Sequence, residues 1–391
     1  MVKIVLKSGK DQAILRFHPW IFSGAIKKTE GKPAEGDLVE VYSDKNDFLA
    51  LGHYQVGSIA VRIVSFVQVD IDYAFWRSKL YQAYKLRQDL GLTENPETNV
   101  YRLIHGEGDG LPGLIIDIYN NTAIIQMHSI GMYHIRDQLS QAIKDIYGDR
   151  LISIYDKSEA TLPYKANLGA KNEFIFGSEQ QGEVIEYGNK FLINWIEGQK
   201  TGFFIDQREN RKLVEFYSNE RSVLNMFSYT GGFSVYALRG RAKLVHSVDS
   251  SEKAIELNNQ NVALNFPSAN HEAYCEDVFQ FLNHIDNKYD LIILDPPAFA
   301  KHQDALSNAL KGYKRLNAKA ISKIRPGGIL FTFSCSQIVN KELFRQAVFS
   351  AAAIAKRNVR ILHQLTQPPD HPINIYHPEG EYLKGLVLYV E

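Results

Sequence analysis

The stretch SVLNMFSYTGGF, residues 222–233, decides the fold class of this chain. SVLNMFS is an apolar run of strand length, and the glycine pair after it suits a sharp turn into a helix. The same strand-then-helix alternation continues from about residue 180 to the end, with further strands expected at LVHSVDSS, EAYCED, DLIILDPP, ILFTFSCS and KGLVLYVE. Near-continuous apolar strands that alternate with helices predict an α/β domain with a doubly wound, mostly parallel sheet.

Two regions with different patterns of expected strands and helices precede this domain. Residues 1–70 contain short, closely spaced strands, which predict a small β-rich barrel or sandwich. Residues 71–180 open with a helix and continue with a glycine-rich loop, a hairpin that turns at Asn120-Asn121 and a second helix. This pattern is typical of an α+β domain. We therefore expect three domains, at residues 1–70, 71–180 and 181–391.

The composition is that of an ordinary globular protein, because 45% of the 391 residues are hydrophobic and 23% are charged. Basic and acidic residues number 44 each, so the net charge is zero and any nucleic-acid contact requires a local basic patch. Two cysteines can form neither a disulfide framework nor a four-cysteine zinc site. No signal peptide or long apolar run is recognisable, which predicts a cytoplasmic protein.

The expected strand ends carry a candidate nucleotide site, because ligands of doubly wound sheets bind beyond the carboxyl ends of the strands. Asp249 can accept hydrogen bonds from ribose hydroxyls, and Asp277 from an adenine amino group. The first loop lacks a full GxGxxG motif and a Walker lysine, which favours S-adenosylmethionine over a dinucleotide. A simple turn and helix N-caps remain the structural alternatives. The candidate cofactor residues of this loop are Asn225, Phe227, Ser228, Tyr229, Gly231 and Gly232.

Cys335 ends the ILFTFSCS strand and follows a DPP sequence at residues 295–297. By position alone, a lone cysteine is more often a small buried hydrophobe. Methylases of exocyclic amines usually place an aromatic residue directly after the two prolines, whereas this chain has Ala298 before Phe299. That departure points away from an amino-group target.

A pyrimidine C5 atom gives Cys335 a chemical role. This carbon is a poor nucleophile until a thiolate adds at C6. We therefore interpret Cys335 as the catalytic nucleophile and Asp295 as the residue that binds N3 or the exocyclic amine. The thiol pKa, about 8.5 in a free cysteine, must be lowered by a cationic neighbour or by the cofactor's sulfonium. Cys275 is interpreted as structural.

Seven blocks in order closely resemble the RlmI-like family of 23S rRNA (cytosine-C5) methyltransferases. The blocks are RFHPWIFSGAI, GEGDGLPGLIIDIY, GQKTGFFIDQRENR, NMFSYTGGFSVYAL, LDPPAFAK, TFSCS and DHPINIYHPEGEYLKGL. The resemblance covers essentially the whole chain. It implies an N-terminal PUA domain, a central EEHxH-type domain and a Rossmann-like class I methyltransferase domain that uses S-adenosylmethionine.

The resemblance also implies site residues and partners. It assigns the catalytic cysteine to Cys335 and the motif aspartate to Asp295, and it implies no metal, which leaves His371 and His377 to loop packing. The expected partner is RNA, 23S rRNA or its large-subunit precursor, with no membrane, and the protein is expected to be a monomer or homodimer. Further candidates are Lys200, Thr201, Phe204, Asp206, Gln207 and Asp295 for the cofactor, and Arg16, His18, Trp20 and Arg208 for RNA.

Two departures from the family pattern fall in the first domain, where Phe17 replaces a common glycine and residues 55–58 replace an N-P-x-S loop. Trp20 is equally compatible with a place in the core of the β domain. Three functions remain open: a cytosine-C5 methyltransferase, a C5 methyltransferase of uracil or of another RNA such as tRNA, and a non-catalytic RNA-binding factor of ribosome assembly. Retention of both Cys335 and Asp295 argues against the third.

Overall fold

The computed structural model describes residues 1–163, 168–178, 182–300 and 302–391. The chain forms two compact units that interleave in sequence. The first comprises Met1–Val184, Ile193–Phe203 and Pro369–Gly380, and the second comprises Ile185–Leu192, Phe204–Pro368 and Glu381–Glu391. Within the described ranges, no helix combines the length and the apolar character needed to cross a bilayer.

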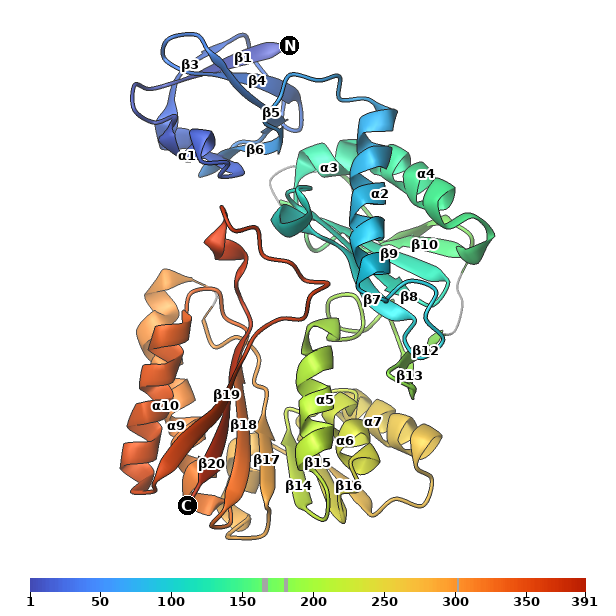
Figure 1. The fold of residues 1–391 in the computed structure, drawn as a ribbon, viewed down its shortest axis with the longest axis vertical. Helices are drawn as coiled ribbons and strands as arrows, with labels where there is room; N and C mark the ends of the chain where they lie inside the picture. Colours follow the sequence, from blue (N-terminus) through green and yellow to red (C-terminus); the bar gives the residue numbers. More distant parts are fainter. Residues whose placement is uncertain (164–167, 179–181, 301) are drawn as a thin grey trace. The chain divides into compact units, whose positions relative to one another are not determined.

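The first unit begins with a six-stranded sheet of order β2-β6-β5-β4-β1-β3 (Figure 1). Alternate apolar side chains of its strands, such as Ile4 and Leu6, bury into one core that also takes Val39 and Val41. The prediction of a small β-rich domain at the start of the chain is therefore confirmed. Its elements are β1 (Val2–Leu6), α1 (Gln12–Leu15), β2 (Trp20–Phe22), β3 (Ile26–Glu30), β4 (Leu38–Tyr42), β5 (Phe48–Tyr54) and β6 (Ile59–Ser65).

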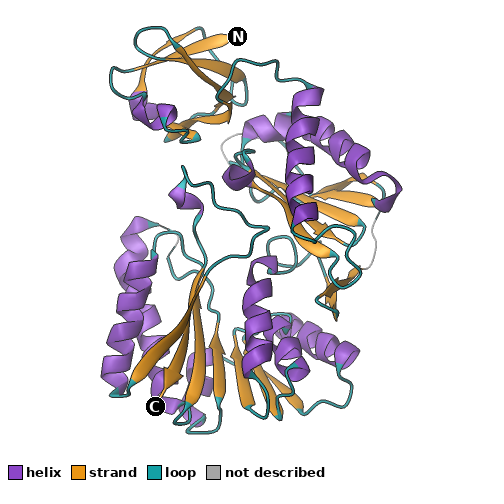
Figure 2. Ribbon diagram, viewed as in Figure 1, coloured by secondary structure: helices purple, strands orange, loops and turns teal. Residues whose placement is uncertain are grey.

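A five-stranded sheet of order β11-β10-β9-β8-β7 follows in the same unit, packed against helices (Figure 2). The predicted hairpin is confirmed, because Tyr119 pairs with Thr122 and Asn120 takes the positive φ of 57° that a tight turn requires. The elements are α2 (Tyr73–Asp89), β7 (Val100–His105), β8 (Leu114–Tyr119), β9 (Thr122–Met127), α3 (Ile130–His134), α4 (Arg136–Tyr147), β10 (Ser153–Asp156) and β11 (Glu173–Phe176).

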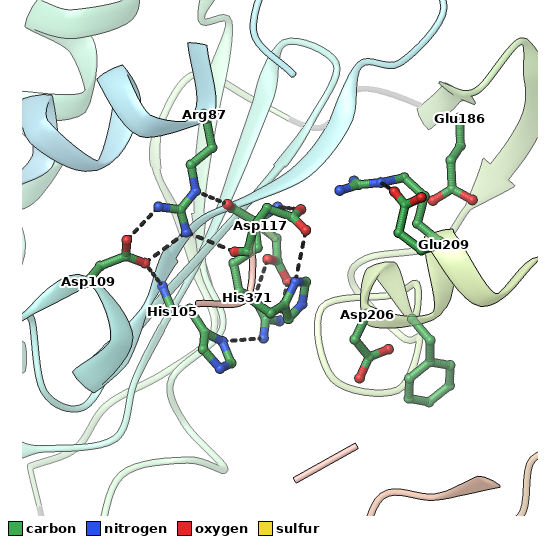
Figure 3. Close-up of polar contacts among 12 residues, drawn as sticks. Arg87, His105, Asp109, Asp117, Glu186, Asp206, Glu209 and His371 are labelled. Carbon is green, nitrogen blue, oxygen red and sulfur yellow. Dashed lines mark hydrogen bonds and ion pairs between the residues drawn. The ribbon is translucent and has the colours of Figure 1, made fainter. Parts of the chain in front are cut away.

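A buried ion pair fixes the segment Pro369–Gly380 to this part of the first unit. The fully buried guanidinium of Arg87 donates to both carboxylate oxygens of Asp109 and to the carbonyl oxygen of Asp370, the last at 2.8 Å (Figure 3). Asp109 also accepts from the backbone N–H of His105 at 2.6 Å. Because both charges are paired and hydrogen-bonded, their burial is tolerated.

The second unit is built on a seven-stranded sheet of order β16-β15-β14-β17-β18-β20-β19. The strands from β16 to β18 are parallel, and β20 runs antiparallel between β18 and β19. The predicted doubly wound sheet is thus confirmed. The strands are β14 (Ser222–Met226), β15 (Leu244–Asp249), β16 (His271–Cys275), β17 (Leu291–Leu294), β18 (Gly328–Ser334), β19 (Val359–Leu365) and β20 (Lys384–Val390).

Strand order reverses between β14 and β17, so the carboxyl ends of these strands are where a ligand site is expected. Figure 1 shows α9 and α10 together on one side of the strands and α5, α6 and α7 on the other. The helices are α5 (Arg208–Tyr217), α6 (Gly232–Arg239), α7 (Glu252–Asn265), α8 (Val278–Phe281), α9 (Leu306–Lys323) and α10 (Lys341–Ala355). The short strands β12 (Gly182–Glu186) and β13 (Asn189–Ile193) pair with each other where the two units meet in sequence.

Candidate functional site

The loop after β14 has an unusual backbone. Phe227 and Tyr229 have φ values of 59° and 45°, and Gly231 has a φ of 82° as it precedes α6. A Cβ on Gly231 would lie 2.8 Å from the side chain of Asn258, so only glycine fits there. Non-glycine residues in the left-handed region store strain, which occurs often at ligand sites. The loop is therefore built for a close backbone approach.

Acidic residues follow the next two strands, as predicted. Asp249 accepts from the backbone N–H groups of Tyr229, at 2.9 Å, and Ser251, at 3.0 Å, and so fixes the loop after β14. Asp277 is the N-cap of α8 and accepts from the backbone N–H of Gln280. The helix-cap interpretation therefore holds for Asp277, and a carboxylate oxygen with one partner can still accept another donor.

Asn225 and Ser228 are buried, and each has a hydrogen-bond partner within the unit, whereas Oδ1 of Asn225 has none among the described residues. Asn225 donates to the Ser234 hydroxyl at 2.9 Å, and Asn258 donates to the Ser228 hydroxyl at 3.0 Å. These contacts hold β14, α6 and α7 together beneath the loop. Both residues therefore act on the site through the elements that they hold in place.

Asp206 has a carboxylate oxygen in need of a donor. Its Oδ2 accepts from the Tyr382 hydroxyl at 2.7 Å, whereas its buried Oδ1 has no hydrogen-bond partner among the described residues. Such an atom is costly unless a ligand or water donates to it. The ring of nearby Phe204 meets that of Tyr229 edge-on, at 5.2 Å between centroids. Asp206 and Phe204 thus belong with the loop after β14.

Arg211 supports this loop from α5. Its guanidinium forms a buried pair with Glu186, at 2.7 and 2.8 Å, and donates to the carbonyl oxygen of Phe204 at 2.9 Å. A Cβ on Gly232 would lie 3.1 Å from the Arg211 side chain. Arg211 is only 2% exposed, and its charge is neutralised inside the unit.

Lys200 and Thr201 belong to the first compact unit, whereas the other predicted cofactor residues belong to the second. The Thr201 hydroxyl donates to Asp117 at 2.6 Å and lies 2.9 Å from the Tyr119 hydroxyl. Lys200 is exposed, and its carbonyl oxygen accepts from Gln126. Thr201 is therefore already engaged in packing within its own unit.

Asp295 and Cys335 follow β17 and β18, which are parallel neighbours. Gln207 donates to Asp295 at 3.0 Å, so this predicted cofactor residue holds the aspartate. The Cys335 thiol is half-buried and lies 3.9 Å from the carbonyl oxygen of Pro296 in the DPP loop. The sheet therefore brings together the two residues that the sequence assigned to catalysis.

The pKa values of Asp295 and Cys335 are both raised. Burial raises the pKa of Asp295 to about 7, and the charge of Asp206 adds to this increase. Burial also raises the pKa of Cys335 to about 12, with further increases from Asp295 and Asp206. The sequence analysis expected a lowered thiol pKa, but the protein without cofactor raises it. A carboxylate that titrates near neutrality beside a thiol can accept its proton.

Lys384 is a residue that the sequence analysis missed. It begins β20 opposite Ser334, is 3% exposed, and its ammonium donates to the carbonyl oxygen of Ser336. Burial lowers its pKa to about 8, while the neighbouring Cys335 favours its charged form. Lys384 is thus the cationic neighbour that lowers the thiol pKa against burial. A lysine at the start of the otherwise apolar strand KGLVLYV was the available signal.

The Asp295→Asn variant is expected to be more stable than the wild type above pH 7. A folded-state pKa above the ordinary value of 3.8 means that the native state holds a proton that the unfolded state has lost, so stability falls as pH rises from about 4 to 7. We expect a gain of roughly 1 to 3 kcal/mol at pH 8, since one pKa unit corresponds to about 1.4 kcal/mol and the carboxyl is partly exposed. Urea unfolding at pH 5 and pH 8 measures the difference. An equal gain at both values would contradict the prediction.

The residues proposed for RNA contact differ in accessibility. Arg16 is exposed, whereas Trp20 is half-buried and its indole N–H donates to Glu107 at 2.8 Å. Arg208 is only 1% exposed, which argues against direct RNA contact by its guanidinium. Of the four, Arg16 retains the most favourable position, because the His18 side chain is only 16% exposed.

Comparison with known proteins identifies the chain. Residues 162–383 match the family of S-adenosylmethionine-dependent methyltransferases, and residues 4–66 match the PUA-like domain. The chain belongs to this methyltransferase family. Relatives named Ribosomal RNA large subunit methyltransferase I from Aeromonas salmonicida and Erwinia tasmaniensis are 40% and 38% identical, and the alignments cover at least 99% of each chain.

Solved structures agree with the fold of this methyltransferase. A Streptococcus mutans protein assigned as an S-adenosylmethionine-dependent methyltransferase matches over 100% of both chains with a TM-score of 0.85 and 22% identity. The methyltransferase SMU.776, complexed with SAH, matches over 100% of both chains with a TM-score of 0.86 and 23% identity. The first sheet is therefore a PUA-like domain, and the seven-stranded sheet is the Rossmann-like methyltransferase core.

The cofactor of this methyltransferase is S-adenosylmethionine. The residues present fit it, because Phe227 and Tyr229 hold the loop after β14 in the left-handed region, a strained backbone that often occurs at ligand sites. The buried Oδ1 of Asp206 also awaits a donor, such as the amino group of the cofactor's methionine part. The prediction of this cofactor from the glycine loop and the strand-end aspartates is confirmed.

Proposed function

We propose that this methyltransferase forms 5-methylcytosine in large-subunit ribosomal RNA, with Cys335 as the covalent nucleophile. The observation that carries the proposal is the placement of Cys335 and Asp295 on the adjacent parallel strand ends of β18 and β17. An enzyme that methylates a nucleophilic nitrogen needs no thiol there. An enzyme that methylates a pyrimidine carbon does need one.

Two findings favour ribosomal RNA as the substrate. Relatives that align over nearly the whole chain carry the name of a ribosomal RNA large subunit methyltransferase, and the N-terminal domain is PUA-like. Both findings also favour the cytoplasm as the place of action. The central domain at 71–180 is proposed to be the EEHxH-type domain of the RlmI-like family.

The DPP loop supports a carbon target over an amino group. The Phe299 ring packs on Tyr313, at 4.7 Å between centroids, and belongs to the partly buried side chains around the main core. It is therefore engaged in packing and is not free to stack on a flipped base. The DPP loop therefore has no aromatic residue directly after the prolines, and the next aromatic residue, Phe299, is engaged in packing.

The proposed reaction begins at the thiol. Asp295 accepts the Sγ proton, directly or through water, and Sγ bonds to C6 of cytosine, which makes C5 nucleophilic. When bound, the cofactor would supply the methyl group of its sulfonium to C5, and cleavage of the sulfur–methyl bond would leave a neutral thioether. Loss of the C5 proton to a base and cleavage of the Sγ–C6 bond restore the aromatic ring and the thiolate. The protonated Asp295 carboxyl can meanwhile donate to N3, since its pKa is about 7.

The cofactor residues have different roles in this proposal. Gly231 and Gly232 let the backbone approach the cofactor, and Asp249 and Asp277 accept from its ribose and adenine. Asp206 accepts from its amino group. Phe227 and Tyr229 present the strained loop backbone, whereas Asn225, Ser228 and Gln207 act through the groups that they hold.

Removal of the Lys384 charge is expected to make Cys335 less reactive. In a Cys275→Ala background, Cys335 is the sole thiol, so its alkylation by iodoacetamide can be followed alone. Lys384→Met should lower the alkylation rate at pH 8 by roughly threefold to tenfold, because this cation lowers the pKa of the Cys335 thiol and favours the reactive thiolate. Lys384→Arg keeps the charge and should react more nearly like the wild type. Equal rates for Lys384→Met and the wild type would exclude a role in activating the thiol.

RNA that carries 5-fluorocytidine tests the proposed chemistry. The release step requires a base to remove a proton from C5, and a fluorine atom at C5 cannot be removed in this way. The Cys335–C6 adduct should therefore accumulate as a covalent complex that survives denaturation. Unmodified rRNA with labelled cofactor then gives the position of the methyl group. Trapping by 5-fluorouridine alone would favour uracil, and labelling of tRNA but not rRNA would favour the other RNA. RNA binding without transfer to any RNA would favour the non-catalytic assembly factor.

A further inference from the structure

Two histidines and a glutamate meet in the first compact unit, in a cluster distinct from the methyl-transfer site. Nε2 of His18 lies 3.6 Å from Oε1 of Glu379, and Nε2 of His377 lies 3.7 Å from Oε2 of the same carboxylate. One potential ligand atom from each residue lies within 4.8 Å of those from the other two. His18 precedes β2 of the PUA-like domain, and the other two belong to the segment Pro369–Gly380.

His377 supplies an independent reason to expect a ligand. Its side chain is buried, with the residue 3% exposed, yet neither ring nitrogen has a hydrogen-bond partner among the described residues. Its Nε2 faces the Glu379 carboxylate at a separation longer than a hydrogen bond. A buried imidazole without partners costs free energy, and a cation that takes its lone pair removes that cost.

The ring of His377 is held firmly in place. It meets the Trp20 ring edge-on at 4.3 Å between centroids. Its backbone N–H donates to Asn374, at 2.8 Å, and its carbonyl oxygen accepts from Gly380, at 3.1 Å. Trp20 is fixed in turn by its hydrogen bond to Glu107. The ligand atom is thus preorganised.

His18 is set up in the way that ligating histidines usually are. Its Nδ1 lies 3.2 Å from the carbonyl oxygen of Trp20 and also 3.2 Å from the backbone nitrogen of Trp20, so the tautomer of the ring decides which of the two contacts is a hydrogen bond. When Nδ1–H donates to that oxygen, the lone pair is left on Nε2, the nitrogen that faces Glu379. A metal-bound histidine commonly donates its other N–H to a backbone carbonyl, which fixes both tautomer and orientation.

We propose that His18, His377 and Glu379 bind one divalent transition-metal ion of the zinc class. Two imidazoles and a carboxylate suit Zn²⁺, Co²⁺ and Ni²⁺ better than Mg²⁺ or Ca²⁺, which prefer oxygen ligands alone. Donors about 2.0–2.1 Å from a tetrahedral ion are about 3.4 Å apart. The two histidine–carboxylate separations, 3.6 and 3.7 Å, are close to that value, and the three ligand atoms together lie within 4.8 Å of one another. The ion would fasten the segment Pro369–Gly380 to the PUA-like domain. This proposal replaces the expectation of loop packing for His377 and does not depend on the RNA target.

The test uses the full-length chain after treatment with a chelator. Calorimetric titration with Zn²⁺ should show one saturable site, and Co²⁺ should give the visible absorption of a bound ion. Glu379→Gln changes a side chain that is 47% exposed and should leave the fold intact. Glu379→Gln, His18→Gln and His377→Gln should each weaken binding at least roughly tenfold. The matched control is His284→Gln, which changes an exposed histidine outside the cluster and should bind like the wild type.

A second readout follows from Trp20. Cu²⁺ bound beside His377 should quench Trp20 fluorescence, and the Glu379→Gln variant should need more Cu²⁺ for the same quenching. The proposal is overturned if no single saturable site is found. It is equally overturned if Glu379→Gln and His377→Gln bind like the wild type, or if His284→Gln weakens binding as much as they do.

Discussion

Replacement of Cys335 by alanine is expected to reduce methyl transfer to RNA at least roughly a thousandfold. A pyrimidine C5 without a thiol adduct at C6 is too weak a nucleophile to attack a methyl sulfonium, and catalytic nucleophiles commonly contribute this much or more to the rate. Single-turnover transfer of labelled methyl to unmodified large-subunit rRNA measures the effect. Cys335→Ala should also form no covalent complex with RNA that carries 5-fluorocytidine.

Cys275→Ala is the matched control. Cys275 is exposed at the end of β16, and its thiol lies 3.6 Å from the carbonyl oxygen of Ser250. We expect its methyl-transfer rate to stay close to that of the wild type. Cofactor binding by Cys335→Ala, measured by calorimetry, should be unchanged, which separates a lost nucleophile from a damaged fold. A methyl-transfer rate of Cys335→Ala within about threefold of the wild-type rate would contradict the covalent mechanism.

The second large effect is expected for Arg211→Met, in the free energy of unfolding of the methyltransferase unit. This change leaves Glu186 charged and buried without its partner, and the loss of one partner of such a pair typically costs about 3–5 kcal/mol. Such a cost is a large share of the roughly 5–15 kcal/mol that stabilise a typical domain. Affinity for S-adenosylmethionine should also fall, because Arg211 supports Phe204 and the glycine loop.

The location of the tryptophans makes this measurement selective. All three, Trp20, Trp76 and Trp195, belong to the first compact unit. Tryptophan fluorescence therefore follows that unit, and far-ultraviolet circular dichroism follows both. Arg211→Met should shift a circular-dichroism transition to lower denaturant and leave the fluorescence transition nearly unchanged. A shift of the fluorescence transition alone would contradict the prediction.

Two further variants isolate the buried pair. Glu186→Gln combined with Arg211→Met removes both charges and should be less destabilised than Arg211→Met alone. Arg239→Met removes a partly exposed arginine that lies 3.7 Å from Glu215, and it should cost less than about 1 kcal/mol. Equal losses for Arg211→Met and Arg239→Met would show that burial of the pair does not matter.

Several residues show why one part of the site was predictable and another was not. Gly231, Asp249, Asp295 and Cys335 lie directly after strands, so local pattern and strand order suffice to place them. Lys384 acts on Cys335 only because β20 inserts antiparallel beside β18, and a pairing between distant segments leaves no local mark. The sequence analysis missed Lys384 for this reason.

Burial is the other property that the sequence failed to show. Arg208 and Arg211 have a spacing that is typical of one exposed basic face of a helix, yet both are buried. Glu186, which neutralises Arg211, comes from β12 and is remote along the chain. His18 and His377 likewise lie close together in space although they are far apart in the sequence. Only the folded chain shows which charges find partners.

The sequence by itself determined the α/β methyltransferase core, the small β domain before it, the cofactor and the order of the site motifs along the chain. These features depend on periodicity and on the backbone demands of glycine and proline, which act between near neighbours. The tertiary structure alone decided the cationic neighbour of Cys335, the raised pKa values of Cys335 and Asp295, and the meeting of His18 with His377 and Glu379. Burial and Coulomb interactions depend on distance in space, and the order of residues does not specify that distance.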